Sequence, residues 1–115
     1  MSKVKVTVIK KSSIREMFGN NLPVGINQDM LTEQCHVFKV GQEFIIDASP
    51  NAQPDQSWEK CPAGFCPWAY ADIQRDIVHL IFGGSYPWVK EKGVAISCCT
   101  DGLRPVVFKI ERIQD

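Results

Sequence analysis

Residues 67–84 read PWAYADIQRDIVHLIFGG, and this stretch predicts the main helix of the protein. Pro67 suits the first helical position, because its missing N–H would have no partner there. The apolar residues of the stretch recur at helical spacing and form one stripe: Ala69, Ile73, Ile77, Leu80 and Ile81. Gly83-Gly84 supplies the left-handed residue that commonly ends a helix. We therefore expect one main helix at about residues 67–82.

The stretches on either side of this helix have the patterns of strands. Residues 3–11, 93–99 and 104–113 alternate apolar and polar side chains, as half-buried strands do. Residues 36–48 are rich in aromatic and β-branched side chains, with Gly41 marking a turn or bulge. Strands before and after one helix predict an α+β fold, an antiparallel sheet with the helix on one face. The pattern leaves open whether this sheet is open or a partly closed barrel.

The rest of the chain predicts loops. Residues 12–33 are weakly patterned and predict a long irregular loop, in which Ser12 or Ser13 could cap a short helix. Thr100-Asp101-Gly102 predicts a hairpin turn, since Asp-Gly tolerates positive φ. A chain of 115 residues has the length of one domain, so residues 1–115 are expected to share a single core.

Composition and charge restrict the function. The chain has 13 basic and 13 acidic residues, so its net charge is zero and general attraction to nucleic acid is not expected. It has no apolar run long enough to span a membrane, and its first residues lack the features of a secretory signal. We therefore expect a cytoplasmic protein with neither nucleic acid nor membrane as a partner. The motifs of nucleotide hydrolysis, dinucleotide binding, zinc proteases and serine hydrolases are absent from the sequence.

Four of the five cysteines fall in two clusters, and these clusters form the first candidate site. In a reducing compartment such thiols serve as metal ligands, reactive groups or core side chains. Cys61 and Cys66 flank a turn before the helix, and Cys66 is expected at its N-cap, where the helix dipole favours thiolate. Their C-x4-C spacing differs from the C-x2-C of zinc ribbons and thioredoxin-like proteins. A turn that contains a buried cysteine therefore stays an alternative.

Cys98 and Cys99 form the second cluster, at the end of a predicted strand. Neighbouring side chains of a strand point to opposite faces. Cys98 continues the apolar face of Val94 and Ile96, and Cys99 continues the face of Ala95 and Ser97. One core thiol and one outward thiol are thus expected. The candidate metal or redox residues are Cys61, Cys66, Cys98 and Cys99.

Polar and aromatic residues near the clusters extend the candidate site. Asp72 lies on a polar face of the helix and, with Cys66, is a candidate catalytic residue; a solvated, mutually paired face is the alternative. Asp101 and Arg104 could bind a carboxylate or phosphate, or could pair with each other. Trp68 and Trp88 lie beside the helix ends, where they could line a ligand pocket or belong to a core or interface.

Two long segments resemble a family of small uncharacterised prokaryotic proteins. The segments are GFCPWAYADI at 64–73 and CCTDGLRPV at 98–106, and the resemblance covers nearly the whole chain. It implies no chemistry, because the family has no established function. It does imply a shared residue pattern: Cys66, Asp72, Cys98, Cys99, Asp101 and Arg104.

Two functions remain open from the sequence. The first is a cysteine-centred site that binds a metal or performs thiol redox chemistry at the helix start and the 98–104 hairpin. The second is a non-catalytic module that binds a small molecule, or forms a homo-oligomer, through its Trp and Tyr loops. The sequence does not decide whether the protein is an enzyme, or whether a metal is its cofactor.

Overall fold

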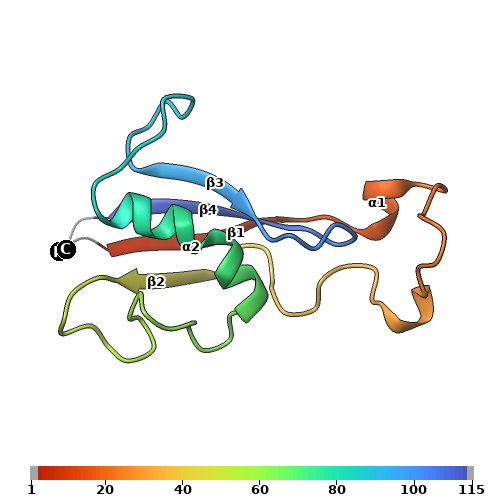
Figure 1. Ribbon diagram of the computed structural model, residues 1–115, viewed down its shortest axis with the longest axis horizontal. Coiled ribbons are helices and arrows are strands. Elements are labelled where there is room, and N and C mark those ends of the chain that lie inside the picture. The colour runs from red at the N-terminus through yellow and green to blue at the C-terminus, as the bar shows by residue number, and fades with distance from the viewer. Residues whose placement is uncertain (1–2, 114–115) are drawn as a thin grey trace.

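The computed structural model describes residues 3–113 and shows a four-stranded sheet with one long helix against it (Figure 1). In chain order the elements are β1 (Lys3–Lys11), α1 (Ile14–Phe18), the 3-10 turn η1 (Gln28–Met30), β2 (Glu43–Asp47), α2 (Pro67–Ile81), β3 (Val94–Cys98) and β4 (Val106–Ile113).

The sheet has the strand order β2-β1-β4-β3, and each neighbouring pair is antiparallel. This confirms the predicted α+β class. Of the two forms that the sequence left open, the partly closed barrel is wrong, because β2 and β3 are edges and the sheet is not closed.

The hydrophobic core lies between α2 and one face of the sheet. The central strand β1 buries Val4, Val6 and Val8 there, as its alternation predicted. The five apolar residues that predicted the helix are all buried, at most 2% exposed. The apolar face of the strand, with a period of two residues, packs against the apolar stripe of the helix, with a period of 3.6 residues. The two elements therefore share one core.

Local signals determine both ends of α2. Cys66 is the N-cap and Pro67 the first helical residue, as predicted. At the other end Gly83 has φ +97°, its N–H donates to the Leu80 carbonyl, and the Gly84 N–H donates to the His79 carbonyl at 2.7 Å. This pair of bonds is a Schellman motif, which needs a residue with positive φ. The prediction of 67–82 is correct to within one residue.

The segment between β1 and β2 contains the short helix that the sequence suggested. Ser13 caps α1 and exchanges hydrogen bonds with Glu16, which forms a capping box. The strand predicted over 36–48 is wrong in its first half, since β2 begins at Glu43. Gly41 has φ +91° and turns the chain before β2. The aromatic and β-branched residues before Gly41 therefore lie outside the strand, although their composition predicted one.

The face of β3 that enters the core is the one with smaller side chains. Ala95 is 2% exposed and Cys99 9%, whereas Ile96 is 55% exposed. The sequence correctly predicted one core thiol and one outward thiol, but the apolar face of Val94 and Ile96 is not the one under α2. Val94 is nevertheless buried, at 8% exposed, so Ile96 is the apolar residue of that face that lies open.

Tyr70 is a buried hydroxyl of α2 and predicts an alkaline loss of stability. Its O–H donates to the Trp58 carbonyl at 2.7 Å, and burial raises its pKa to about 12. The folded state therefore keeps a proton that the unfolded chain loses near pH 10. The stabilisation is complete below that pH and is lost as the pH rises toward 12.

We expect the free energy of unfolding to fall by up to about 2–3 kcal/mol over this range. Urea unfolding at a series of alkaline pH values measures it. The Tyr70→Phe variant is the control, because it lacks the titrating group and should show a flatter pH dependence. Equal slopes in the two proteins would contradict the assignment.

Candidate functional site

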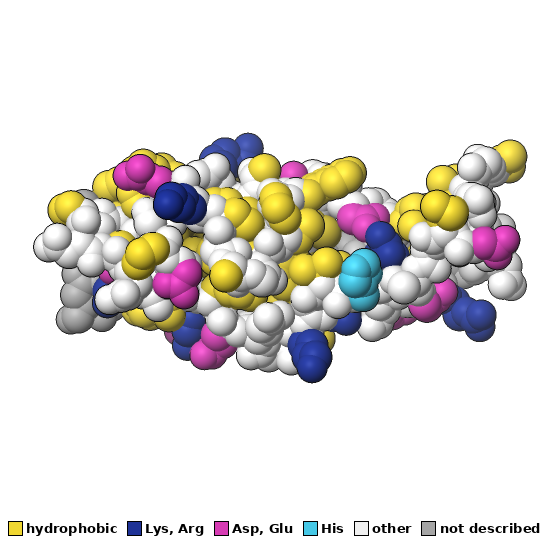
Figure 2. All heavy atoms as spheres, turned by 90° about the horizontal axis from the view of Figure 1, so that it is seen from below, with side chains coloured by type: hydrophobic (Ala, Val, Ile, Leu, Met, Phe, Trp, Pro, Cys, Tyr) yellow, Lys and Arg dark blue, Asp and Glu magenta, His cyan; other side chains and the backbone are white. Residues whose placement is uncertain are grey.

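Three of the five cysteines line one cavity of about 170 Å³, which we name the cysteine pocket. Three segments that are distant in sequence form it: 35–38 before β2, 66–69 at the start of α2, and 99–106 between β3 and β4. The lining residues that carry polar or sulfur groups are Cys35, His36, Cys66, Trp68, Cys99, Asp101 and Arg104. Figure 2 shows one face of the molecule, on which hydrophobic side chains form a patch beside a histidine and charged side chains.

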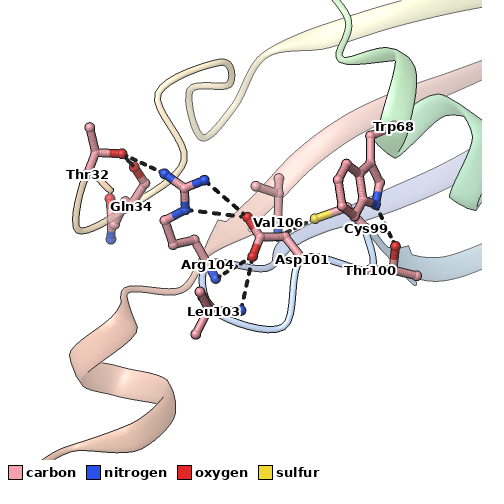
Figure 3. Close-up of polar contacts among 9 residues, drawn as sticks. All are labelled: Thr32, Gln34, Trp68, Cys99, Thr100, Asp101, Leu103, Arg104 and Val106. Carbon is pink, nitrogen blue, oxygen red and sulfur yellow. Dashed lines mark hydrogen bonds and ion pairs between the residues drawn. The ribbon is translucent and has the colours of Figure 1, made fainter. Parts of the chain in front are cut away.

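The start of α2 places Cys66 and Trp68 at the pocket. Cys66 is half-buried, and its side chain makes no capping hydrogen bond. Trp68 is 64% exposed, and its indole N–H donates to the Thr100 hydroxyl at 2.6 Å, as Figure 3 shows. That bond connects the helix start to the residue that follows Cys99. Trp68 is thus not a core residue, and it can cover a ligand in the pocket.

Asp101 and Arg104 shape the loop between β3 and β4. One carboxylate oxygen of Asp101 accepts the N–H groups of Leu103 and Arg104, at 3.0 and 3.2 Å, and the other lies 3.4 Å from the Arg104 guanidinium (Figure 3). The predicted hairpin is confirmed, since β3 and β4 pair as antiparallel neighbours across this loop, but Gly102 does not adopt the positive φ on which the prediction was based. An aspartate side chain organises a longer loop instead. The two side chains also pair with each other, one of the predicted alternatives.

Arg104 links this loop to the segment that carries Cys35. Its guanidinium donates to the Thr32 hydroxyl at 3.0 Å, and that hydroxyl donates to the Gln34 carbonyl (Figure 3). Sequence reasoning missed Cys35 and His36, because they follow a weakly patterned loop. Cys35 also lies too far along the chain from the other cysteines to form a recognisable motif with them. Only the tertiary fold brings them to the pocket.

Cys99 is the most enclosed of the pocket thiols. It is 9% exposed, and its Sγ accepts the Val106 N–H at 3.3 Å. Burial is the main cause that raises the pKa of Cys99 above its ordinary value. At neutral pH this sulfur is therefore a protonated thiol, and it needs an acceptor for its proton before it can react.

Four predicted site residues lie outside the cysteine pocket. Cys61 is exposed on the loop before α2, its Sγ donates to the Phe65 carbonyl at 3.2 Å, and partial burial raises its pKa. Cys98, Asp72 and Trp88 line a separate hollow beside β3. The structure thus brings Cys66, Cys99, Trp68, Asp101 and Arg104 together and separates the other four from them.

Asp72 connects α2 to the loop that follows β3. Its carboxylate accepts the Thr100 N–H at 2.7 Å and the Thr100 hydroxyl at 3.0 Å. Asp76, one turn further on, accepts the Tyr86 hydroxyl at 2.5 Å. The alternative of a solvated face whose residues pair with one another is therefore wrong, since the partners come from loops after the helix.

Two structural features of residues 3–113 concern metals and membranes. No group of three or more His, Cys, Asp and Glu side chains in that range is arranged to hold a metal ion. No helix in that range is long and apolar enough to cross a membrane.

The chain matches no family model, no curated protein and no solved structure. The family resemblance of its two long segments therefore stays a prediction, and the chemistry of the site depends on the geometry alone.

Proposed function

We propose that the protein performs thiol redox chemistry in the cysteine pocket, with Cys66 as the attacking thiol and Cys99 as the resolving thiol. The convergence of three cysteines from distant segments on one small cavity supports this proposal. Thiols that meet in a pocket can exchange electrons with a bound ligand, whereas thiols dispersed over a surface react one at a time.

The two thiols differ in the way that their roles require. Cys66 is half-buried at the N-terminus of α2, so a reagent can reach its sulfur. Cys99 is buried, and its raised pKa keeps it protonated until the first reaction has occurred. Cys66 is also the N-cap of α2, where the backbone N–H groups of the first turn have no helical partners.

The reaction that fits is thiol–disulfide exchange with a small disulfide. The Cys66 thiolate attacks one sulfur of the substrate and forms a mixed disulfide, and the other half leaves as a thiolate that takes the proton of Cys99. The Cys99 thiolate then attacks the Cys66 sulfur, forms the Cys66–Cys99 disulfide and releases the second half. The protein loses two electrons and two protons, and the substrate gains both.

The pocket also suits one end of such a substrate in size and charge. A cavity of about 170 Å³ holds a group of a few heavy atoms, less than the 300–1,000 Å³ of drug-sized sites. Arg104 at its wall can bind a carboxylate, and Trp68 can cover an apolar part.

Disulfide mapping tests the proposal directly. The reduced protein, purified without oxygen, is incubated with oxidised glutathione, and its disulfides are identified by mass spectrometry of proteolytic fragments. We expect a Cys66–Cys99 disulfide in the wild type. The Cys66→Ser variant should not form this disulfide, and it should take up glutathione at least about tenfold more slowly.

Cys98 provides the matched control, because it adjoins Cys99 but lies outside the pocket. The Cys98→Ser variant should oxidise as the wild type does. Glutathione uptake that depends on Cys98 or Cys61, and not on Cys66, would overturn the proposal. A Cys66–Cys35 disulfide would keep the pocket chemistry but reassign the resolving role.

A non-catalytic binding function is the second candidate, and the presence of Trp68, Asp101 and Arg104 around the same cavity favours it. In that case the thiols would stay reduced with oxidised glutathione. Elemental analysis of the same anaerobic preparation tests the alternative that the cysteines bind a metal. Near-stoichiometric metal would replace the redox proposal with a metal-binding one.

A further inference from the structure

A second hollow lies between α2 and the free edge of β3, and we name it the edge groove. Its volume is about 690 Å³, and no residue of the cysteine pocket lines it. Its walls come from both elements and the loop that joins them: Asp72, Arg75, Asp76, Tyr86, Trp88, Ala95, Ile96, Ser97, Cys98 and Thr100. In Figure 1 this loop rises beside β3, on the side away from β4.

The backbone of β3 offers unpaired hydrogen-bonding groups along this groove. The Cys99 N–H donates to Val106 and the Arg112 N–H donates to Gly93, in register with the rest of the β3–β4 ladder. Antiparallel pairing alternates, so the N–H and C=O groups of Ile96 and Cys98 point away from β4. Within residues 3–113 no strand lies on that side of β3.

The opposite edge of the sheet differs. There the chain returns along β2, where the Asp47 N–H donates to the Gln56 carbonyl and the Trp58 N–H donates to the Asp47 carbonyl. Part of the β2 edge is thus already occupied. The β3 edge has an adjoining groove in addition to its free backbone groups.

The side chains of the edge groove favour a basic group. Two carboxylates, Asp72 and Asp76, and one guanidinium, Arg75, leave it with an excess of one negative charge. Trp88 is 77% exposed, and its ring stacks on Tyr86 with centroids 4.8 Å apart. An exposed indole beside carboxylates attracts the ammonium of lysine or the guanidinium of arginine.

We propose that the edge groove binds an extended peptide segment of another protein, which adds to β3 as a further strand and places a Lys or Arg side chain in the groove. Strand addition to an exposed edge obtains affinity from the main chain and specificity from alternate side chains. Both components are present here, since Ile96 and Cys98 supply the backbone groups and Asp76 and Trp88 receive the side chain.

A second copy of this chain fits the groove less well. The β3 sequence, VAISC, contains no basic residue to place beside the carboxylates.

Peptide selection followed by N-methylation tests the proposal. A library of random nonapeptides displayed on phage is selected against the full-length protein, and the most enriched peptide is synthesised. We expect Lys or Arg to be enriched at one position. Methylation of every second backbone nitrogen should weaken binding at least about tenfold, and methylation of the others less than about twofold.

Variants and chemical shifts locate the site. Peptide addition should shift the backbone amide signals of Ile96 and Cys98, but not those of Cys35 and Cys66. Asp76→Asn should weaken the basic peptide by about tenfold, whereas Glu43→Gln on the β2 edge makes the same charge change without effect.

Three outcomes of the peptide experiments would overturn the proposal. They are the absence of any enriched peptide, an N-methylation pattern without alternation, and shifts confined to another surface. A dimer in light scattering that an Ile96→Pro variant dissolves would also overturn it, in favour of a second copy. Each of these results is independent of thiol oxidation, so the edge groove and the cysteine pocket succeed or fail separately.

Discussion

Replacing Phe38 with alanine is expected to lower the free energy of unfolding by about 3–5 kcal/mol. Phe38 belongs to no strand, yet it is only 1% exposed. Its ring meets Phe65 edge-on at a centroid distance of 4.9 Å and Phe108 at 5.2 Å. Removing the ring leaves a cavity among these close-packed rings, and the loss is a large part of the stability of a typical small domain, about 5–15 kcal/mol.

Phe82→Ala provides the matched control. Its phenyl ring is 58% exposed at the end of α2, so the same change should cost much less. Urea unfolding followed by circular dichroism measures both. A cost at Phe38 no larger than that at Phe82 would contradict the packing described above. Because Phe38 also lines the cysteine pocket, we expect faster alkylation of Cys99 in the Phe38→Ala variant.

Replacing Arg112 with leucine is expected to lower the free energy of unfolding by about 2–3 kcal/mol. Its guanidinium lies on the helix side of β4 and donates to the carbonyls of Leu80 at 2.8 Å and Gly84 at 2.7 Å. The Leu80 carbonyl lies in the last turn of α2, where it also accepts the Gly83 N–H, and the Gly84 carbonyl follows the end of the helix. A positive charge at this end also complements the helix dipole.

Arg112→Lys should recover only part of the loss, because a single ammonium cannot reproduce the fork of donors that reaches two carbonyls. Lys109→Leu is the control on the same strand. Lys109 points to the other face and forms a surface ion pair with Glu111 at 3.7 Å, worth at most about 1 kcal/mol. Equal losses at the two positions, measured by urea unfolding, would show that the cap of α2 contributes nothing.

Interactions between near neighbours in the chain were predictable from the sequence. The helix at 67–82, the alternation of β1 and the α+β class all follow from apolar periodicity, and the short helix after Ser13 follows from its cap. Each of these patterns extends over one or two turns of helix or over one strand. Reading one short stretch of the chain is therefore enough to recognise it.

The candidate site was predictable only in part. Cys66 was expected to meet Cys98 or Cys99, and of these two Cys99 lines the cysteine pocket with it, together with Trp68, Asp101 and Arg104. Cys61, Cys98, Asp72 and Trp88 had equally good local signals but lie elsewhere. Local spacing shows which residues could react; it does not show which of them share a cavity.

The sequence by itself therefore determined the elements and the class of fold, through the periodic burial of side chains that are close in the chain. The tertiary structure decided the open form of the sheet, the face of β3 that α2 covers, and the addition of Cys35 to the pocket. Each of these depends on contacts between distant segments, such as the Arg104–Thr32 hydrogen bond. The energies of such contacts depend on which surfaces fit together in space, and the local pattern of a single chain does not contain that information.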